Sequence, residues 1–226
     1  VERSRSDQGR LLEARGQLQK RDDSWRLALA DIALPGVAGD KGDGRLSAAW
    51  RNGAHIAPRL ALRAASLPLE PLAALATRMS APGPLRDGLL RAQPRGRLAR
   101  LDALWLPRGE AAPRYYVAAK VAALAMQDAR QPRAVDGLSF EMKANGGGGH
   151  VEFDDDAFTL TDDAHLLAPL AIEQMNGALS WRRQGDGPLT ARAQRLRARV
   201  AGHRVGLDGS LEHLAGQAPV VDMNAR

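Results

Sequence analysis

The acidic residues and the histidines are the side chains of this chain best suited to chemistry. Five aspartates near the middle carry oxygen atoms of the kind that calcium prefers: Asp154, Asp155, Asp156, Asp162 and Asp163. Their spacing does not match the alternating ligands of a calcium-binding loop, so we expect a solvated turn. The five histidines are scattered, and no two have the i, i+4 spacing with an intervening glutamate that zinc proteases use. The sequence therefore predicts no metal site.

A glycine run and the serines complete the search for catalytic groups. The run Gly146–Gly149 is followed by His150, and it lacks the lysine and the Ser/Thr of a phosphate-binding loop. We therefore interpret it as a hairpin turn. No serine lies in the Gly-x-Ser-x-Gly elbow of the α/β-hydrolases. We predict no catalytic residue, no cofactor and a protein that is not an enzyme.

The positive charge of the chain raises the question of a nucleic-acid partner. The formal net charge is +6, from 32 Lys plus Arg and 26 Asp plus Glu. The arginines are spread at strand period, as at Arg195, Arg197 and Arg199, and aromatic residues make up only 4% of the chain. Nucleic-acid interfaces gather basic residues and stacking aromatics, so we expect no nucleic-acid partner. A solvated strand face and attraction to anionic lipid headgroups are the interpretations left open.

Alternation of polar and apolar residues is the pattern that must position these side chains. In Arg195–Val200, three arginines alternate with Leu196, Ala198 and Val200. Successive side chains of a strand point to opposite faces, so this segment predicts a strand with one polar and one apolar face. Similar segments, separated by glycine turns, recur along the chain. We predict a mainly β protein, built as an elongated, curved antiparallel sheet that forms an open groove.

One part of the sequence departs from the strand pattern. Its apolar residues recur at helical spacing: Leu69, Leu72, Leu75 and Met79. Pro68 and Pro71 suit the first turn of a helix, and Pro82–Pro84 would end it. A second short helix is expected over Leu85–Ala92. The sequence therefore predicts a helical insert near residues 68–92.

The composition limits the core and the class of protein. Hydrophobic residues make up 44% of the chain, but with so few aromatics the core is expected to be thin. No apolar run approaches the roughly 20 residues of a membrane span, and with no cysteine the chain has no disulfides. Because the sequence opens on Val1, we expect residues 1–226 to be a single elongated β segment of a larger protein.

The order of several weak motifs resembles the central region of YhdP-like proteins, in the AsmA-like superfamily. The motifs are Pro68–Leu75, Leu89–Leu98, Val135–Phe140, a hairpin expected over Val151–Leu160, Pro169–Ile172 and Gly177–Trp181. The resemblance covers roughly Gly9 to Leu211. It implies a periplasmic β trough in a parent protein anchored in the inner membrane of Gram-negative bacteria, with the anchor outside this sequence. It also implies a role in carrying phospholipid to the outer membrane and contact with other envelope proteins.

Apolar strand residues are the candidates for contact with the acyl chains of such a phospholipid. They are Leu60, Leu62, Ala118, Ala122, Leu124, Ala191, Ala193, Leu196, Ala198 and Val200. The arginines at 195, 197 and 199 are the candidates for a rim that meets headgroups or water. The alternative is a structural or protein-interaction module of an envelope-assembly protein, whose apolar face is closed by the helices or by a partner chain.

Overall fold

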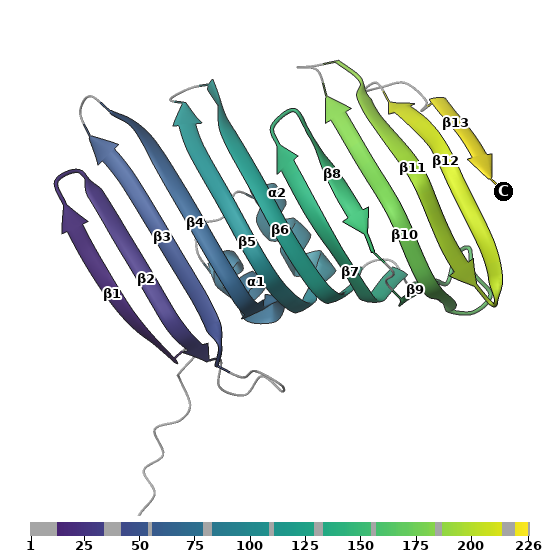
Figure 1. The fold of residues 1–226 in the computed structure, drawn as a ribbon, viewed down its shortest axis with the longest axis horizontal. Helices are drawn as coiled ribbons and strands as arrows, with labels where there is room; N and C mark the ends of the chain where they lie inside the picture. Colours follow the sequence, from purple (N-terminus) through teal and green to yellow (C-terminus); the bar gives the residue numbers. More distant parts are fainter. Residues whose placement is uncertain are drawn as a thin grey trace, which may run out of the picture.

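In the computed structural model, one antiparallel sheet contains all thirteen strands that it describes, and two helices lie against it (Figure 1). The structure describes residues 13–33, 42–53, 56–78, 83–108, 111–128, 133–154, 157–183, 187–213 and 220–225. The strands are β1 (Glu13–Arg21), β2 (Ser24–Ala33), β3 (Gly44–Gly53), β4 (Ile56–Pro68), β5 (Arg95–Arg108), β6 (Ala111–Gln127), β7 (Arg133–Asn145), β8 (Gly148–Phe153), β9 (Phe158–Asp162), β10 (Leu170–Arg183), β11 (Leu189–Val200), β12 (His203–His213) and β13 (Val220–Ala225). The helices are α1 (Leu69–Arg78) and α2 (Gly83–Ala92). The mainly β class and the helical insert are thus confirmed.

The sheet is a meander in which nearly every strand pairs with its neighbours in the sequence. Such connections need only short turns. The turn predicted over Gly146–Gly149 is shorter in the structure, where Gly146 and Gly147 join β7 to β8 and Gly148 and Gly149 begin β8. The exception is β9, which pairs with β7 and β10 and not with β8. The hairpin expected over 151–160 is therefore wrong. Strands β8 and β9 instead occupy successive parts of the same position in the sheet, between β7 and β10.

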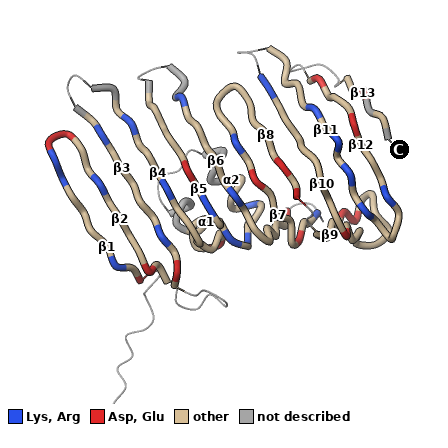
Figure 2. Tube along the Cα trace, in the orientation of Figure 1, with Lys and Arg blue, Asp and Glu red and all other residues tan. Residues whose placement is uncertain are grey.

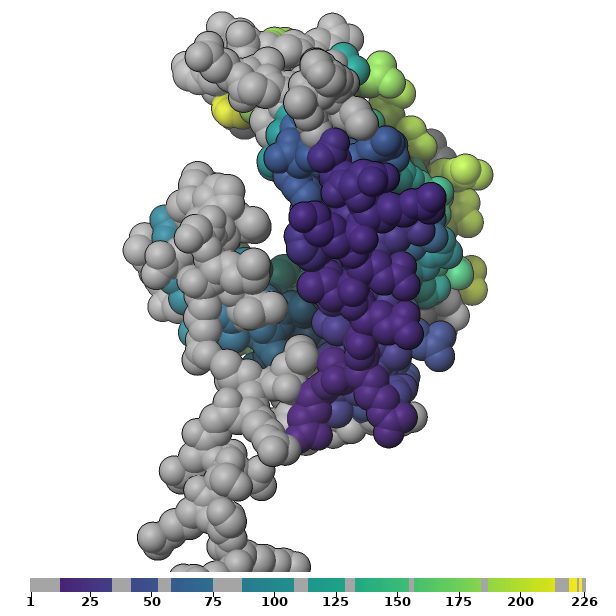
Figure 3. Space-filling view, turned by 90° about the vertical axis from the view of Figure 1, so that its left-hand side faces the viewer, coloured from purple at the N-terminus to yellow at the C-terminus, as the bar shows by residue number. Residues whose placement is uncertain are grey.

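The sheet curves towards the side on which the helices lie (Figure 3). Leu69 and Leu72 of α1 pack against a buried cluster whose members come from the facing side of the sheet. These are Ile32, Ala64, Leu67, Leu98, Val121 and Leu124. We call the side of the sheet that carries this cluster the concave face, and the opposite side the convex face.

A line of β-bulges crosses the sheet at the level of this cluster. Irregular register or positive φ occurs at Asp31 in β2, Ala123 in β6, Gly137 in β7, Gly177 in β10 and Arg195 in β11. A bulge adds one residue to one strand, bends that strand and increases its twist. Because the bulges are aligned, their bends add up to one crease across the sheet. The crease accounts for the curvature and brings the buried cluster beneath α1.

Candidate functional site

The concave face carries two unbroken rows of uncharged, mainly apolar residues that run across the strands. Residues directly opposite each other in paired strands share a face, so the register defines each row. The central row is Leu29, Leu46, Ala64, Leu101, Ala119, Met142, Val151, Leu179, Ala193 and Gly209. The parallel row is Leu18, Leu27, Ala48, Leu62, Ala103, Val117, Ala144, Gly149, Trp181, Ala191, Leu211 and Val221. Neither row contains a charged side chain.

The helices cover only part of this face. Helix α1 contacts β4 and β5, and α2 contacts β6. Along the central row, the exposed fraction rises from 7% at Ala64, near α1, to 37% at Leu179 on β10. Large concave side chains elsewhere are also exposed, at 42% for Trp25 and 41% for Trp105. The apolar surface of the described strands is therefore larger than the helices can bury.

The pairing register places eight of the ten candidate groove residues on the concave face. They are Leu60, Leu62, Leu124, Ala191, Ala193, Leu196, Ala198 and Val200. The extra residue at the β11 bulge keeps Ala193 and Leu196 on the same side, since both face odd-numbered partners on β12. The structure thus places these candidates on one face, spread over β4, β6 and β11.

The structure places Ala118 and Ala122 on the convex face, contrary to the expectation that they line the groove. Ala118 is paired with Asp102 and Lys143, whereas its neighbour Ala119 is paired with Leu101 and Met142. Ala122 lies next to Val121, which is buried on the concave side, and so points the other way. Segment 117–123 reads Val-Ala-Ala-Lys-Val-Ala-Ala, and alternation places Lys120 on the same face as Ala118 and Ala122.

The three arginines of β11 lie along the convex side rather than on a rim of the concave face. Arg197 and Arg199 are paired with Gly206 and Arg204, away from Leu196 and Ala198. Arg195 is the bulged residue, with φ of 49°, and its backbone N–H donates to Asp208 Oδ1 at 2.6 Å. The backbone at Arg195 therefore helps to form the crease, a role that alternation alone does not predict.

Charged residues of both signs are distributed over the described strands (Figure 2), and several are paired on the convex face. Asp102 accepts from Arg100 at 2.8 Å and lies 3.3 Å from Arg63. Lys120 donates to Glu141 at 2.6 Å. The hydrogen bond from Lys120, followed by its charge, lowers the pKa of Glu141. These exposed pairs contribute little stability, and they make the convex face a hydrated surface.

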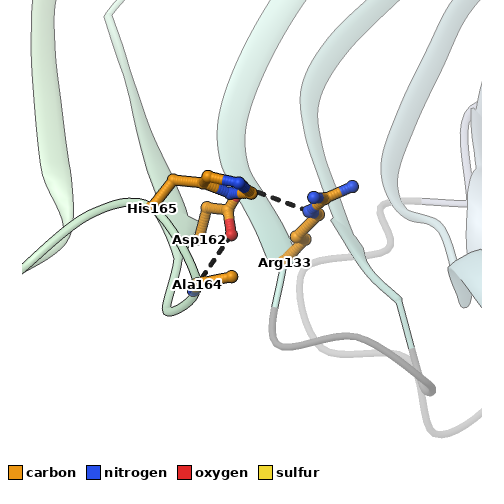
Figure 4. Close-up of polar contacts among 4 residues, drawn as sticks. All are labelled: Arg133, Asp162, Ala164 and His165. Carbon is orange, nitrogen blue, oxygen red and sulfur yellow. Dashed lines mark hydrogen bonds and ion pairs between the residues drawn. The ribbon is translucent and has the colours of Figure 1, made fainter.

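Acidic and histidine side chains do not form a metal site in the described part of the chain. Asp155 and Asp156 lie outside the described residues, while Asp162 is engaged by protein groups. Its carboxylate is 3.1 Å from Arg133 Nε and 3.0 Å from His165 Nδ1 (Figure 4). Burial raises the pKa of Asp162, but the hydrogen bonds from His165 and the Ala164 N–H, with the charge of Arg133, lower it overall. The chemistry of this carboxylate is thus that of a structural anchor.

Comparison with known families gives one match over nearly all of the sequence. The family model described as YhdP protein matches residues 2–226, almost the whole chain. The chain belongs to the YhdP family. No curated protein and no solved structure gives a significant match. Membership in the YhdP family indicates an envelope protein related to lipid transport.

In this YhdP-family chain, sequence reasoning missed several concave residues. Met142, Val151 and Leu179 belong to the central row, and Trp181 lies over Gly149 in the parallel row. The alternation within each strand carries the signal for these residues, but the rows depend on the register between strands.

Neither described helix is long and apolar enough to cross a bilayer.

Proposed function

We propose that this chain is a non-enzymatic segment of a bridge-like lipid transfer protein, in which the concave face holds phospholipid acyl chains. The observation that carries the proposal is the pair of uncharged rows, which run from strand to strand without a charged side chain. A folded protein normally buries such a surface, and large exposed apolar patches mark binding sites. The rows run perpendicular to the strands, as a path for a lipid along the sheet would.

The free energy of such an interaction follows from the apolar area that leaves water. Burial of a methylene contributes about 0.8 kcal/mol, so a sixteen-carbon tail gains on the order of 12 kcal/mol. The interaction has no preferred direction, so a tail can move along the row without breaking specific bonds. Twelve strand positions about 4.8 Å apart give a path of roughly 50 Å.

Family membership supports a place in the cell envelope. We further propose that the segment works in the periplasm, within a parent protein anchored in the inner membrane, and that phospholipid passes between inner and outer membranes. The groove is proposed to be open between β7 and β12, where exposed concave residues such as Leu179 and Val205 lie beyond the contacts of α1 and α2.

A closed structural module is the second candidate function. The observation that favours it is the packing of Leu69 and Leu72 of α1 onto the concave cluster, because helices are one way to cover an apolar face. In this case a partner chain of the envelope-assembly machinery would cover the rest of the face, and the purified monomer would carry no lipid.

Lipid content of the purified chain separates the two functions. We expect phospholipid in stoichiometric amounts when the chain is expressed in Gram-negative bacteria, purified and analysed by native mass spectrometry and lipid extraction. In Ala198→Glu, a charge enters the concave face between Met175 and Val205, and the lipid content should fall while the fold persists. A folded, lipid-free wild-type monomer would support the closed module.

A further inference from the structure

A pocket at the edge of the sheet where β7 begins and β9 ends has features that the two rows lack. It has a volume of about 640 Å³ and lies between the end of α2, the start of β7, β9 and the turn that leads to β10. Its half-buried apolar lining includes Ala92, Val135, Leu160, Leu166 and Leu170. Ligand pockets for small molecules commonly have volumes of this size and linings of this kind.

Ionisable side chains border this apolar pocket, and those of Arg91, Arg133 and His165 are exposed to solvent. Arg91 comes from the last turn of α2, and Arg133 is the first residue of β7. His165 lies in the turn after β9, and the carboxylates of Asp128 and Asp162 complete the set. The pocket therefore combines an apolar interior with a polar opening, as a site for an amphipathic molecule requires.

The contacts of Asp162 hold one wall of the pocket in place. Its carboxylate joins Arg133 on β7 to His165 in the turn, and it accepts from the Ala164 N–H at 3.2 Å (Figure 4). The negative charge of Asp162 is thus largely compensated by these groups, which belong to the wall of the pocket itself. Arg91 differs, because its Nε donates to the carbonyl of Asp87 in its own helix at 3.2 Å, and the guanidinium is exposed.

We propose that this pocket holds one acyl chain of a phospholipid, with the phosphodiester group at Arg91. The inference rests on the proposed function, since it makes the pocket a side entrance to the concave face. The lining is continuous with that face: Met126 is paired with Val135, Val135 with Leu160, and Leu160 with Leu170. An incoming tail can therefore pass from the pocket to the apolar surface without crossing a polar layer.

Two leucines beside the pocket add apolar surface at its opening. Leu90 is 51% exposed and precedes Arg91, and Leu167 is fully exposed and follows Leu166. An isolated exposed leucine is ordinary, but here both lie next to pocket-lining residues, one on α2 and one in the turn after β9. An arginine between apolar groups suits a phosphodiester with its attached tails, because guanidinium binds phosphate oxygens in a bidentate manner.

The test uses a phosphatidylglycerol that carries a photoreactive diazirine in its acyl chain, loaded onto the purified chain and mapped by tandem mass spectrometry after irradiation. We expect adducts at 133–135 and 160–170, in addition to adducts on the concave strands β10 and β11. In Arg91→Ala, adducts in the pocket segments should fall roughly tenfold, because a hydrogen bond to a charged group is lost. Adducts on β11 should stay unchanged.

Controls separate the possible failures. Arg26→Ala removes an exposed convex arginine and should leave both groups of adducts unchanged. Millimolar inorganic phosphate should not protect the pocket segments; full protection would identify a free-phosphate site and overturn the proposal. Adducts on β11 without adducts in the pocket segments would overturn this inference alone, whereas the absence of adducts from all concave strands would contradict the proposed function.

Discussion

At the scale of single residues, neighbours in one strand differ in environment because the pleat turns them to opposite faces. Ala118 and Ala119 are the clearest pair, since they have the same side chain and adjoin the same strands. Ala118 lies between Asp102 and Lys143, and Ala119 lies between Leu101 and Met142. Because both residues lie on β6, the same substitution at each of them compares the two faces of the sheet within one strand.

We expect Ala119→Glu to lower the phospholipid content of the purified chain, and Ala118→Glu to leave it unchanged. The first variant places a carboxylate in the central row, where an acyl chain cannot solvate it, whereas the second adds charge to a hydrated surface. Lipid extraction and mass spectrometry measure the content, and circular dichroism checks the fold. Because Ala119 packs against the core, Ala193→Glu gives a second test in the same row. Equal lipid content in all variants would contradict the assigned face.

The faces could be predicted from the sequence where charge marks one of them. In β11 the arginines alternate with Leu196, Ala198 and Val200, and all three of these lie on the concave face. In β6, Lys120 is the single charged residue between Val117 and Ala123, and alternation places it on the same face as Ala118 and Ala122. The expectation for these two alanines rests on their small size and not on this charge, which is why it is wrong. The pocket at α2 could not be predicted, because its walls come from α2, β6, β7, β9 and β10, which only the fold brings together.

Asp162 gives a prediction for the dependence of stability on pH. Its pKa in the folded state is lowered, so its contribution is present above the ordinary carboxyl pKa, near 4, and is lost as the pH falls through the lowered value. Asp162→Asn should therefore reduce the free energy of unfolding at pH 6, and the difference from wild type should shrink under acid. Chemical denaturation at several pH values measures this. The neighbouring exposed carboxylate in Asp163→Asn serves as the control.

At the scale of elements, the crease sets which surface is concave and how much of it the helices reach. Gly177 in β10 and Arg195 in β11 meet at the crease, and Gly177 has φ of 124°. A Cβ at this position would lie 2.5 Å from the Arg195 carbonyl oxygen and 2.7 Å from the Leu196 Cα. Both atoms belong to the backbone, so no side-chain movement can relieve the contact. The glycine is required by the close approach as well as by its φ.

Gly177→Ala should therefore lower the free energy of unfolding by about 3 kcal/mol, through strain and backbone contact. Gly202 is a matched control, because it also has positive φ, of 77°, but a Cβ there would meet no atom within 4 Å. For Gly202→Ala we expect a loss of about 1 kcal/mol, from the backbone conformation alone. Urea unfolding followed by tryptophan fluorescence compares the two. Equal losses for the two variants would show that the close approach of β11 to Gly177 does not require a glycine there.

At the scale of the whole molecule, the buried cluster is confined to one region of a long sheet. It involves β2, β4, β5 and β6, while every residue of the described edge strand β1 is exposed. Such a distribution predicts uneven stability, with local opening at low free energy away from the cluster. A ligand that binds the exposed part of the concave face would stabilise that part, since binding to the folded state alone favours it.

Removal of lipid should therefore change hydrogen exchange unevenly along the chain. After the purified chain is stripped with detergent, we expect faster amide exchange in β10, β11 and β12, whose concave residues lie beyond the contacts of α1 and α2. Exchange in β4 and β5 should change little, because Ala64, Leu67 and Leu98 remain packed beneath α1. Mass spectrometry of peptic fragments measures both regions in one experiment, and adding phospholipid back should restore the slow exchange. A uniform change across all strands would instead indicate that lipid stabilises the fold globally, without occupying the exposed part of the concave face.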